Sequence, residues 1–307
     1  MMTDQKSRAI AGKSDLWQYV ADKKPQIENA LREYQPLAPA KIETKFNEAV
    51  RYALFSGGKR LRPVMTLLGA ELVGGKSEII IPAACAVEFI HTSSLIFDDL
   101  PCMDDSNERR GNASLHAQFG EGLAVLVAVG FLNSAYHLVF VNHKNSPERA
   151  IRAHFEIVEC VGAAGMVGGQ SVDLALAKNA NSSGFSGEDY EFETVRNLKT
   201  SALMRLALRV GAILAGANQI ELAQLSRFAG LLGDAYQLSD DLLDLEEDSE
   251  IFQSNKTFAA GQGQDAAQLK LKTIIEEAKQ ILIDNFPPNE ARGCLIELTD
   301  YLAERKI

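Results

Sequence analysis

Apolar residues recur at intervals of three and four along almost the whole chain from Ser14 onward. This spacing places them on one face of an α-helix, and no segment shows the turn-bounded alternation of a half-buried strand. The pattern predicts helices over residues 15–34, 41–56, 63–73, 80–98, 120–141, 147–168, 191–216, 218–246, 264–285 and 290–304. It argues against a sheet-based fold, so we expect an all-α protein.

The predicted helices follow one another closely, and the breaks between them are short. Gly57-Gly58, Gly74-Gly75, Pro101 and a polar stretch over residues 178–189 mark the main breaks. None is long enough or low enough in complexity to separate two domains. With 307 residues, of which 46% are hydrophobic, the chain can bury one large core. We expect a flexible tail over residues 1–14 and a single domain over residues 15–307.

Charge and cysteine usage narrow the class of protein. The formal net charge of −10 argues against a general nucleic-acid binder, because such proteins need a basic face. The four cysteines lie far apart without metal-type spacing and indicate reduced thiols. No signal-peptide core occurs near the start, and no apolar run reaches the roughly 18 residues of a membrane span. We therefore expect a cytoplasmic protein with no membrane-spanning segment and no nucleic-acid partner.

A first acidic cluster follows a long apolar segment, in the sequence LIFDDLPCMDDSNERRG at residues 95–111. On an unbroken helix Asp98 and Asp104 would point to different sides, since six residues advance roughly 600°. Pro101 ends the helix or distorts its last turn, so the chain can fold back and bring Asp104 toward Asp98 and Asp99. Carboxylate oxygens suit Mg²⁺, which binds through few carboxylates together with substrate phosphates.

An acidic cluster of this kind is as often a solvated helix end as a functional site. The apolar segment that precedes the cluster and the Arg109-Arg110 pair that follows it favour a functional site here. Guanidinium groups beside metal-binding carboxylates can hold a diphosphate from both sides. We therefore interpret this segment as a diphosphate site that works with metal ions.

A second acidic cluster lies at residues 231–248, LLGDAYQLSDDLLDLEED. Asp240 and Asp244 are four residues apart and share one helix face, while Asp241 lies about 100° around and Gln237 one turn earlier. Leucines on the other side predict a helix packed on the core. One such cluster is common on a surface helix, but two in one all-helical chain are rare, so the pair is the strongest functional signal.

A basic segment, SGGKRLRP at residues 56–63, follows a predicted amphipathic helix. Gly58 allows a ligand to approach the backbone closely, and Lys59, Arg60 and Arg62 place three cations within four residues. The segment is not a nucleotide P-loop, because the GxxxxGK[ST] spacing is absent and no strand precedes it. Solvated cations at a loop–helix junction are the alternative to an anion site.

Five motifs now stand in order: GGKRLRP, DDx₄D followed by RRG, GGQxxD at residues 168–173, Lys199-Thr200, and a late QxxDDxxD. This order resembles the trans-prenyl diphosphate synthases, the family of farnesyl and geranylgeranyl diphosphate synthases, over roughly residues 40–260. The likeness is greatest to bacterial geranylgeranyl diphosphate synthases. It implies an isoprenoid-synthase helical bundle around a deep central cavity, with a polyprenyl synthetase catalytic domain over residues 15–307. It also implies a homodimer that uses Mg²⁺, about three ions per active site.

The resemblance further implies roles for individual residues. The isopentenyl diphosphate site would comprise Gly58, Lys59, Arg62, His91 and Arg110. The metal ions that bridge the allylic diphosphate would be bound by Asp98, Asp99, Asp104, Asp240, Asp241 and Asp244. The allylic diphosphate and the path of its cation would be contacted by Arg109, Lys199, Thr200, Gln237 and Lys256. His91 precedes Asp98 by two helical turns on nearly the same face, which favours ligand contact over a purely structural role.

The implied chemistry needs no conventional base. Metal ions and cationic side chains would stabilise the departing diphosphate. The alkene of isopentenyl diphosphate would attack the allylic carbocation, and the released diphosphate would take the lost proton. Helical walls would exclude water from the cation.

Two features depart from the family pattern. The loop after Asp244 is shorter than usual and lacks one of two expected lysines, and residues 125–131, VLVAVGF, replace a common Gly-Asp pair. The product length should depend on Ser93 and Ser94, about one turn before the first cluster, where farnesyl-making relatives carry an aromatic floor. Two serines leave the tunnel open, so we predict a geranylgeranyl product with Phe89 as the deeper stop.

Three alternatives stay open. A farnesyl or longer-chain polyprenyl diphosphate synthase would use the same chemistry. A class I terpene cyclase would share the helical fold, but its second metal motif differs at Asp244 and Asp248, and it would have no use for the basic segment. A non-catalytic regulatory subunit would tend to lack one of the two acidic clusters, and this chain has both.

Overall fold

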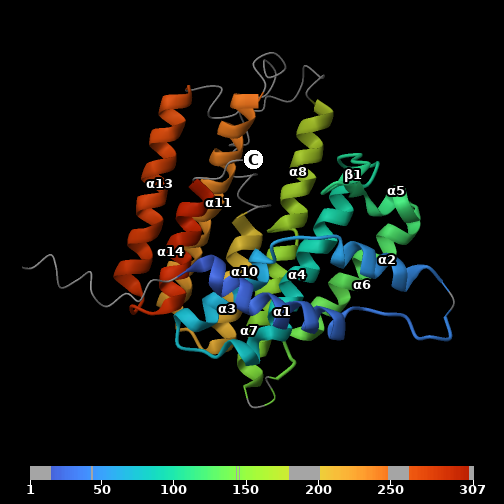
Figure 1. The fold of residues 1–307 in the computed structure, drawn as a ribbon, viewed down its shortest axis with the longest axis horizontal. Helices are drawn as coiled ribbons and strands as arrows, with labels where there is room; N and C mark the ends of the chain where they lie inside the picture. The colour runs from blue at the N-terminus through green and yellow to red at the C-terminus, as the bar shows by residue number, and fades with distance from the viewer. Residues whose placement is uncertain are drawn as a thin grey trace, which may run out of the picture.

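The described part of the chain is a bundle of helices with one short hairpin (Figure 1). This computed structural model describes residues 15–42, 44–142, 144, 146–179, 201–247 and 263–303. The two strands found in these ranges are two residues long each, so the expected all-α fold is confirmed. The elements are α1 (Leu16–Tyr34), α2 (Phe46–Phe55), α3 (Leu61–Leu72), α4 (Ser77–Asp99), β1 (Glu108–Arg109), β2 (Asn112–Ala113), α5 (Leu115–Phe119), α6 (Glu121–Leu138), α7 (Pro147–Val161), α8 (Met166–Asn179), α10 (Ala202–Ala215), α11 (Gln219–Glu247), α13 (Gln264–Asn285) and α14 (Glu290–Ala303).

The predicted span 147–168 is not one helix. Pro147 starts α7 at a position where its missing N–H costs nothing. The helix ends at Val161, Gly162 is extended, and α8 begins only at Met166. Apolar residues keep their helical spacing across this break, so periodicity could not reveal it. The hairpin β1–β2 and the five-residue α5 were also not predicted, because they are too short to show a periodic pattern.

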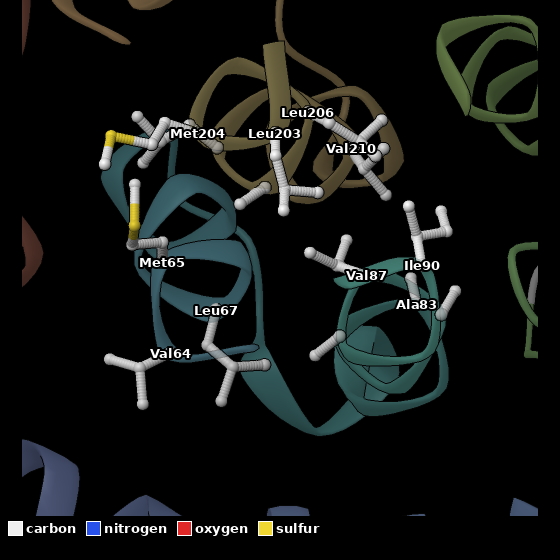
Figure 2. Close-up of a cluster of buried hydrophobic side chains, with 14 of the residues drawn as sticks. Val64, Met65, Leu67, Ala83, Val87, Ile90, Leu203, Met204, Leu206 and Val210 are labelled. Atoms are coloured by element: carbon white, nitrogen blue, oxygen red, sulfur yellow. The ribbon is translucent and has the colours of Figure 1, made fainter. Parts of the chain in front are cut away.

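Helices α3, α4 and α10 form the centre of the core. Leu67 of α3, Val87 of α4 and Leu206 of α10 are fully buried. Figure 2 shows these helices around a common space, into which Leu203 of α10 and Val87 of α4 point. Burying a leucine or valine fully is worth about 1.5–3 kcal/mol each. This core holds α4 rigidly, which fixes the position of the acidic cluster at its end.

The α3 and α10 backbones approach each other closely because each has a glycine at the contact. A Cβ atom on Gly69 would lie 2.2 Å from the carbonyl oxygen of Leu208. A Cβ atom on Gly211 would lie 1.9 Å from the carbonyl oxygen of Thr66. No side chain fits at either position, so the packing of α3, which follows the basic segment, depends on both glycines.

Among the described residues, two helices, α4 and α6, are long and apolar enough to span a membrane by length and composition alone, which is weak evidence for a span. In α4, 78% of the most apolar stretch is buried inside the protein, as in a core helix. In α6 the buried share is 33%, so this helix leaves part of its apolar face at the surface.

The three helices that carry the predicted motifs are directed toward the same end of the bundle. In Figure 1, α4 leads up to the β1–β2 hairpin, while α8 and the C-terminal half of α11 rise beside it. The two acidic clusters follow or lie in these upper segments. The fold therefore gathers motifs that are more than a hundred residues apart in the sequence.

Candidate active site

The first acidic cluster lies where α4 stops. The helix ends at Asp99, and the backbone amide of Asp104 then donates a 2.9 Å hydrogen bond to the carbonyl oxygen of Asp98. The amide of Met103 donates to the carbonyl of Leu100 in the same turn, at 2.8 Å. The prediction that the break at Pro101 folds the chain back onto Asp98 is confirmed.

The aspartates of this cluster differ in their surroundings. Asp98 borders an apolar cavity, whereas Asp99 is 3% exposed and forms an ion pair with Arg109. The Arg109 Nε lies 2.8 Å from both Asp99 oxygens, and this hydrogen bonding raises the pKa of the guanidinium. In this structure the Asp99 carboxylate holds Arg109 in place, and its predicted role as a metal ligand stays a prediction.

The β1–β2 hairpin presents the arginine pair to the site. Arg109 turns toward Asp99, while Arg110 adopts a left-handed backbone (φ 55°). The Arg110 Nη1 donates a 2.9 Å hydrogen bond to the carbonyl of Gly57. Two consecutive arginines thereby serve two different parts of the site, one beside the acids and one beside the basic segment.

The second acidic cluster lies on the C-terminal half of α11. Asp240 and Gln237 are half-buried, and Asp241 is buried. Leu238 and Leu242 pack on α13, which fixes the rotation of the helix. The side chain of Asp244 lies outside the described residues, as do Lys199, Thr200 and Lys256, so their predicted roles stay predictions.

The described residues contain no ready-made cage of three or more metal-ligating side chains. Their donor set nevertheless fits Mg²⁺, because Asp98 and Asp104 share one tight turn and supply hard oxygen atoms. Mg²⁺ keeps several waters and usually binds through one or two carboxylates plus substrate phosphates. A cluster of this kind therefore suits an ion that is completed by a bound diphosphate.

Arg60, one of the three cations of the basic segment, points into the protein. It has a left-handed backbone (φ 56°) and a side chain that pairs with Glu28 at 2.7 Å and Glu88 at 2.6 Å. It also donates to the carbonyl of Leu54 at 2.6 Å. Burial works against its charge, but Glu88 and Glu28 outweigh burial and raise its pKa. Arg60 is thus a structural residue that fixes the loop before α3.

The other basic residues surround a cavity of about 590 Å³, and the structure brings together all five residues predicted for isopentenyl diphosphate. The Arg62 Nη1 lies 3.2 Å from the His91 Nε2. Burial and then the charge of Arg62 lower the pKa of His91 well below its ordinary value, so the imidazole is neutral and accepts from Arg62. Burial also lowers the pKa of Arg62. The predicted residues on the wall are Gly58, Lys59, Arg62, His91 and Arg110.

A second cavity, of about 300 Å³, is almost entirely apolar and begins at Asp98. Ser93 and Ser94 lie on its wall as predicted, and their hydroxyls donate to the carbonyls of Ala128 at 3.1 Å and His91 at 2.9 Å. Because both hydroxyls are satisfied by backbone, the two serines present a small, largely non-polar surface. The cavity can take a hydrocarbon chain.

Phe89 does not lie on the wall of this cavity, which corrects its predicted role as the deeper stop. Its ring is fully buried and packs on Phe131 at a centroid distance of 5.2 Å. One residue corresponds to about 100° of helical rotation, so it is Ile90 that faces the cavity, together with Leu132.

Sequence reasoning missed two tyrosines on the wall of the basic cavity, Tyr236 and Tyr301. Tyr236 immediately precedes Gln237 and could have been found from its place beside the second acidic cluster. Tyr301 lies 242 residues from Lys59 in α14, and its spacing is that of an ordinary partly buried helical residue. No local pattern connects Tyr301 with the basic segment.

Comparisons with known proteins agree with this geometry. The family description Polyprenyl synthetase matches residues 43–281. The chain is 42% identical to the chloroplastic geranylgeranyl pyrophosphate synthase 11 of Arabidopsis thaliana over 239 residues, 76% of this chain and 64% of that protein. It is 38% identical to the chloroplastic geranylgeranyl pyrophosphate synthase of Capsicum annuum over 297 residues, 94% of this chain and 78% of that protein. Its fold is similar to an FPP/GFPP synthase from Zymomonas mobilis, with a TM-score of 0.78, 28% identity, and coverage of 92% of this chain and 99% of that one.

Proposed function

Because the chain belongs to the polyprenyl synthetase family, we propose that it is a prenyltransferase that condenses isopentenyl diphosphate with an allylic diphosphate. The observation that carries this proposal is the arrangement around the end of α4. A cationic cavity lies at His91, and an apolar cavity lies at Ser94 and opens at Asp98. One helix thus borders a site for a metal-free diphosphate, a site for a metal-bound diphosphate and a channel for hydrocarbon.

The two diphosphates are held by different means in this proposal. Asp98, Asp104 and Asp240 would hold the Mg²⁺ ions, which neutralise the charge that develops on the departing allylic diphosphate. Lys59, Arg62 and Arg110, with the neutral His91, bind the other diphosphate without a metal. Since Lys59, Arg62 and Arg110 line one cavity and the proposed metal ligands lie at the end of α4 and on α11, each substrate is directed to its own place.

The reaction follows from this placement. The carbon–oxygen bond of the allylic substrate breaks, and the alkene of isopentenyl diphosphate attacks the resulting carbocation. A proton leaves the adduct to the released diphosphate, so a new carbon–carbon double bond forms. The apolar walls of the cavity, which include Phe97 and Leu132, exclude the water that would otherwise capture the cation.

We propose a geranylgeranyl product of twenty carbons, made from farnesyl diphosphate or a shorter primer. Ser93 and Ser94 support this length, because small side chains beside Asp98 leave the apolar cavity open below the acidic cluster. The names of the relatives from Arabidopsis and Capsicum point the same way. A farnesyl or longer-chain product remains the alternative within the same mechanism.

We also propose that two copies of the chain associate through α6 and α7. Three large apolar side chains on each helix are exposed, and the helices meet where Tyr136 packs on His154. A second copy would cover this apolar face isologously. The exposed residues are Val125, Leu126, Val129, Ile151, Phe155 and Val158. Analytical ultracentrifugation of the wild type and of Phe155→Glu tests this proposal. We expect the wild type to sediment as a dimer and Phe155→Glu as a monomer. A monomeric wild type would refute the proposal.

The release of inorganic diphosphate tests the prenyltransferase proposal against a terpene cyclase. We expect release only when Mg²⁺, isopentenyl diphosphate and an allylic diphosphate are all present. A cyclase would release it from the allylic substrate alone. Asp98→Asn should reduce the rate of diphosphate release about 100-fold, as expected when a group that stabilises the transition state is lost. Asp105→Asn, an exposed change next to the cluster, is the matched control and should retain most of the activity.

A further inference from the structure

Lys59 lies beside two aromatic rings that come from opposite ends of the chain. Its Nζ lies 5.7 Å from the ring centroid of Trp17 and 5.1 Å from that of Tyr301. The same ammonium donates a 2.5 Å hydrogen bond to the Tyr301 hydroxyl. The two rings contact each other edge to face, with centroids 4.9 Å apart and planes at 85°. We call Trp17 and Tyr301 together the aromatic bracket.

The bracket is fixed by the packing of α1 on α14. The backbone amide of Leu16 donates a 2.7 Å hydrogen bond to the carboxylate of Glu297, one turn before Tyr301. Asp15 caps the first turn of α1 by accepting from the amides of Trp17 and Gln18, both at 3.0 Å. Both rings therefore stand on helix ends whose backbones are held, rather than on loops.

One ring of the bracket, Tyr301, also lines the substrate cavity. Tyr301 lines the cavity of about 590 Å³ together with Arg62, His91 and Arg110, while the side chain of Lys59 is exposed at its edge. A phenol that accepts a hydrogen bond from an ammonium can still donate its own proton. The Tyr301 hydroxyl can thus donate to an oxygen atom of an anion in this cavity.

A lysine on a flexible four-carbon stem loses rotamer freedom when it binds an anion. A partner that holds the ammonium in place beforehand lowers this cost and strengthens binding. Cation–π contact and the hydroxyl both favour an ammonium at the bracket, and neither neutralises its charge. The Lys59 ammonium therefore stays available to an anion at the edge of the cavity.

We infer that Trp17 and Tyr301 position Lys59 for the diphosphate of isopentenyl diphosphate, and that the Tyr301 hydroxyl donates a hydrogen bond to that same diphosphate. This inference rests on the proposed function. It assigns two residues outside the basic segment to the metal-free substrate, Tyr301 as a binding residue and Trp17 as a positioning residue. The allylic diphosphate has no contact with either.

Steady-state kinetics test this assignment. Tyr301→Phe keeps the ring but removes the hydroxyl, and we expect it to raise the KM for isopentenyl diphosphate about tenfold. Trp17→Ala should raise the same KM about threefold, and Trp17→Phe should restore most of the loss. The KM for the allylic substrate should not change in any variant. Tyr34→Phe, at the other end of α1 and roughly 26 Å along the helix from Trp17, is the matched control and should match wild type.

The single tryptophan gives a second readout that does not depend on turnover. Because the Lys59 ammonium lies over the Trp17 ring, its movement toward an anion should change the indole emission. Titration of wild type with isopentenyl diphosphate, without Mg²⁺ or allylic substrate, should give a saturating change. The change should vanish in Lys59→Met and require about tenfold more ligand in Tyr301→Phe.

The outcomes separate this inference from the proposed function. If wild type condenses the substrates but Tyr301→Phe and Trp17→Ala leave the isopentenyl KM and the titration unchanged, the bracket has no role in binding. A lower KM in Tyr301→Phe would also overturn the inference, since Tyr301 would then withhold Lys59 from the substrate. If wild type shows a normal titration but no condensation, the proposed function fails and the binding role stands.

Discussion

The backbone amide of Asp104 donates a 2.9 Å hydrogen bond to the carbonyl oxygen of Asp98. This bond brings the backbone of Asp104 back to the end of α4, as the proposed metal site shared with Asp98 requires. It exists because Pro101 follows the last helical turn and prevents regular continuation. The spacing of the cluster is therefore meaningful only together with the proline inside it.

Replacing Pro101 with Ala should weaken the response to metal. Alanine permits α4 to continue, and a continued helix would rotate Asp104 away from Asp98. We expect at least about a tenfold loss of kcat/KM for the allylic substrate, with a higher Mg²⁺ requirement. Activity measured over a range of Mg²⁺ concentrations checks this. Pro147→Ala, at the tolerated first position of α7, is the control. An unchanged Mg²⁺ requirement in Pro101→Ala would contradict the role of the break.

Arg60→Met should destabilise the protein strongly. The substitution leaves Glu88, which is 4% exposed, as a buried carboxylate without its 2.6 Å partner. Breaking a buried pair in this way costs about 3–5 kcal/mol of unfolding free energy, whereas an exposed pair is worth at most about 1 kcal/mol. Denaturant unfolding should therefore separate Arg60→Met from Arg227→Met, which breaks an exposed 3.4 Å pair with Glu277.

The double variant Arg60→Met with Glu88→Gln gives the internal check on this explanation. Without the buried charge, a large part of the lost stability should return. If the double variant is as unstable as the sum of the two single changes, the burial of an uncompensated carboxylate is not the cause.

His91 should make stability depend on pH below about 6.5. Burial, followed by the charge of Arg62, holds the pKa of folded His91 well below the value of 6.5 expected for the unfolded chain. As the pH falls through 6.5, His91 becomes protonated in the unfolded state but stays neutral in the folded state, so the free energy of unfolding decreases. Above 6.5 the group contributes no pH dependence. Arg110, Arg109 and Arg60 add to this repulsion, and Glu88 lines the same cavity.

The measurement is the unfolding free energy of wild type and His91→Asn between about pH 5 and pH 8. The difference between the two should be constant above pH 6.5 and shift in favour of His91→Asn at lower pH, by up to about 1.4 kcal/mol per pH unit. Parallel curves over the whole range would show that His91 titrates normally.

Ser94→Phe should shorten the product. Ser94 lies on the wall of the apolar cavity at the level below Asp98, and a benzyl group there would fill the space that the growing chain needs. Ser93 is 1% exposed and bonded to α6, so Phe at that position would also overpack the core. Phe89→Leu is the control, because Phe89 does not line the cavity. Chromatography of the dephosphorylated products should show farnesol from Ser94→Phe and geranylgeraniol from wild type and Phe89→Leu.

The fold class was predictable because helical periodicity persists through most of the chain. The bounds of α1 and α13 agree with prediction to within one residue, since Asp15 and Gly263 mark clear starts. The break between α7 and α8 was not predictable from periodicity, because the helical spacing of apolar residues continues across the extended Gly162 and the turn that follows it. Helix ends are set by local capping and turn residues, and the spacing of apolar residues alone does not indicate them.

The candidate site was predictable where local sequence carries the chemistry. Lys59, Arg62 and Arg110 meet at one cavity as expected. The placement of Arg60 was not predictable, since a cation beside two others looks like a ligand until Glu28 and Glu88 appear from distant helices. Asp99 differs from Asp98 because Arg109, ten residues further along in β1, forms an ion pair with it.

The placement of Phe89 and Tyr301 shows the same limit. A one-residue shift decides whether α4 offers Phe89 or Ile90 to the cavity, and only packing settles the rotation of a helix that is apolar on nearly every side. Tyr301 reaches the basic cavity through the docking of α14 on α1. Such tertiary contacts have no signature in a single sequence.

The most direct measurement of the central claim is incubation of the protein with labelled isopentenyl diphosphate, Mg²⁺ and, in turn, dimethylallyl, geranyl and farnesyl diphosphate. The products are then dephosphorylated and separated by chromatography. We predict label in a twenty-carbon alcohol with each primer that is accepted, and none when Mg²⁺ is removed by a chelator. Absence of labelled product with all three primers would contradict the assignment of this chain as a prenyltransferase.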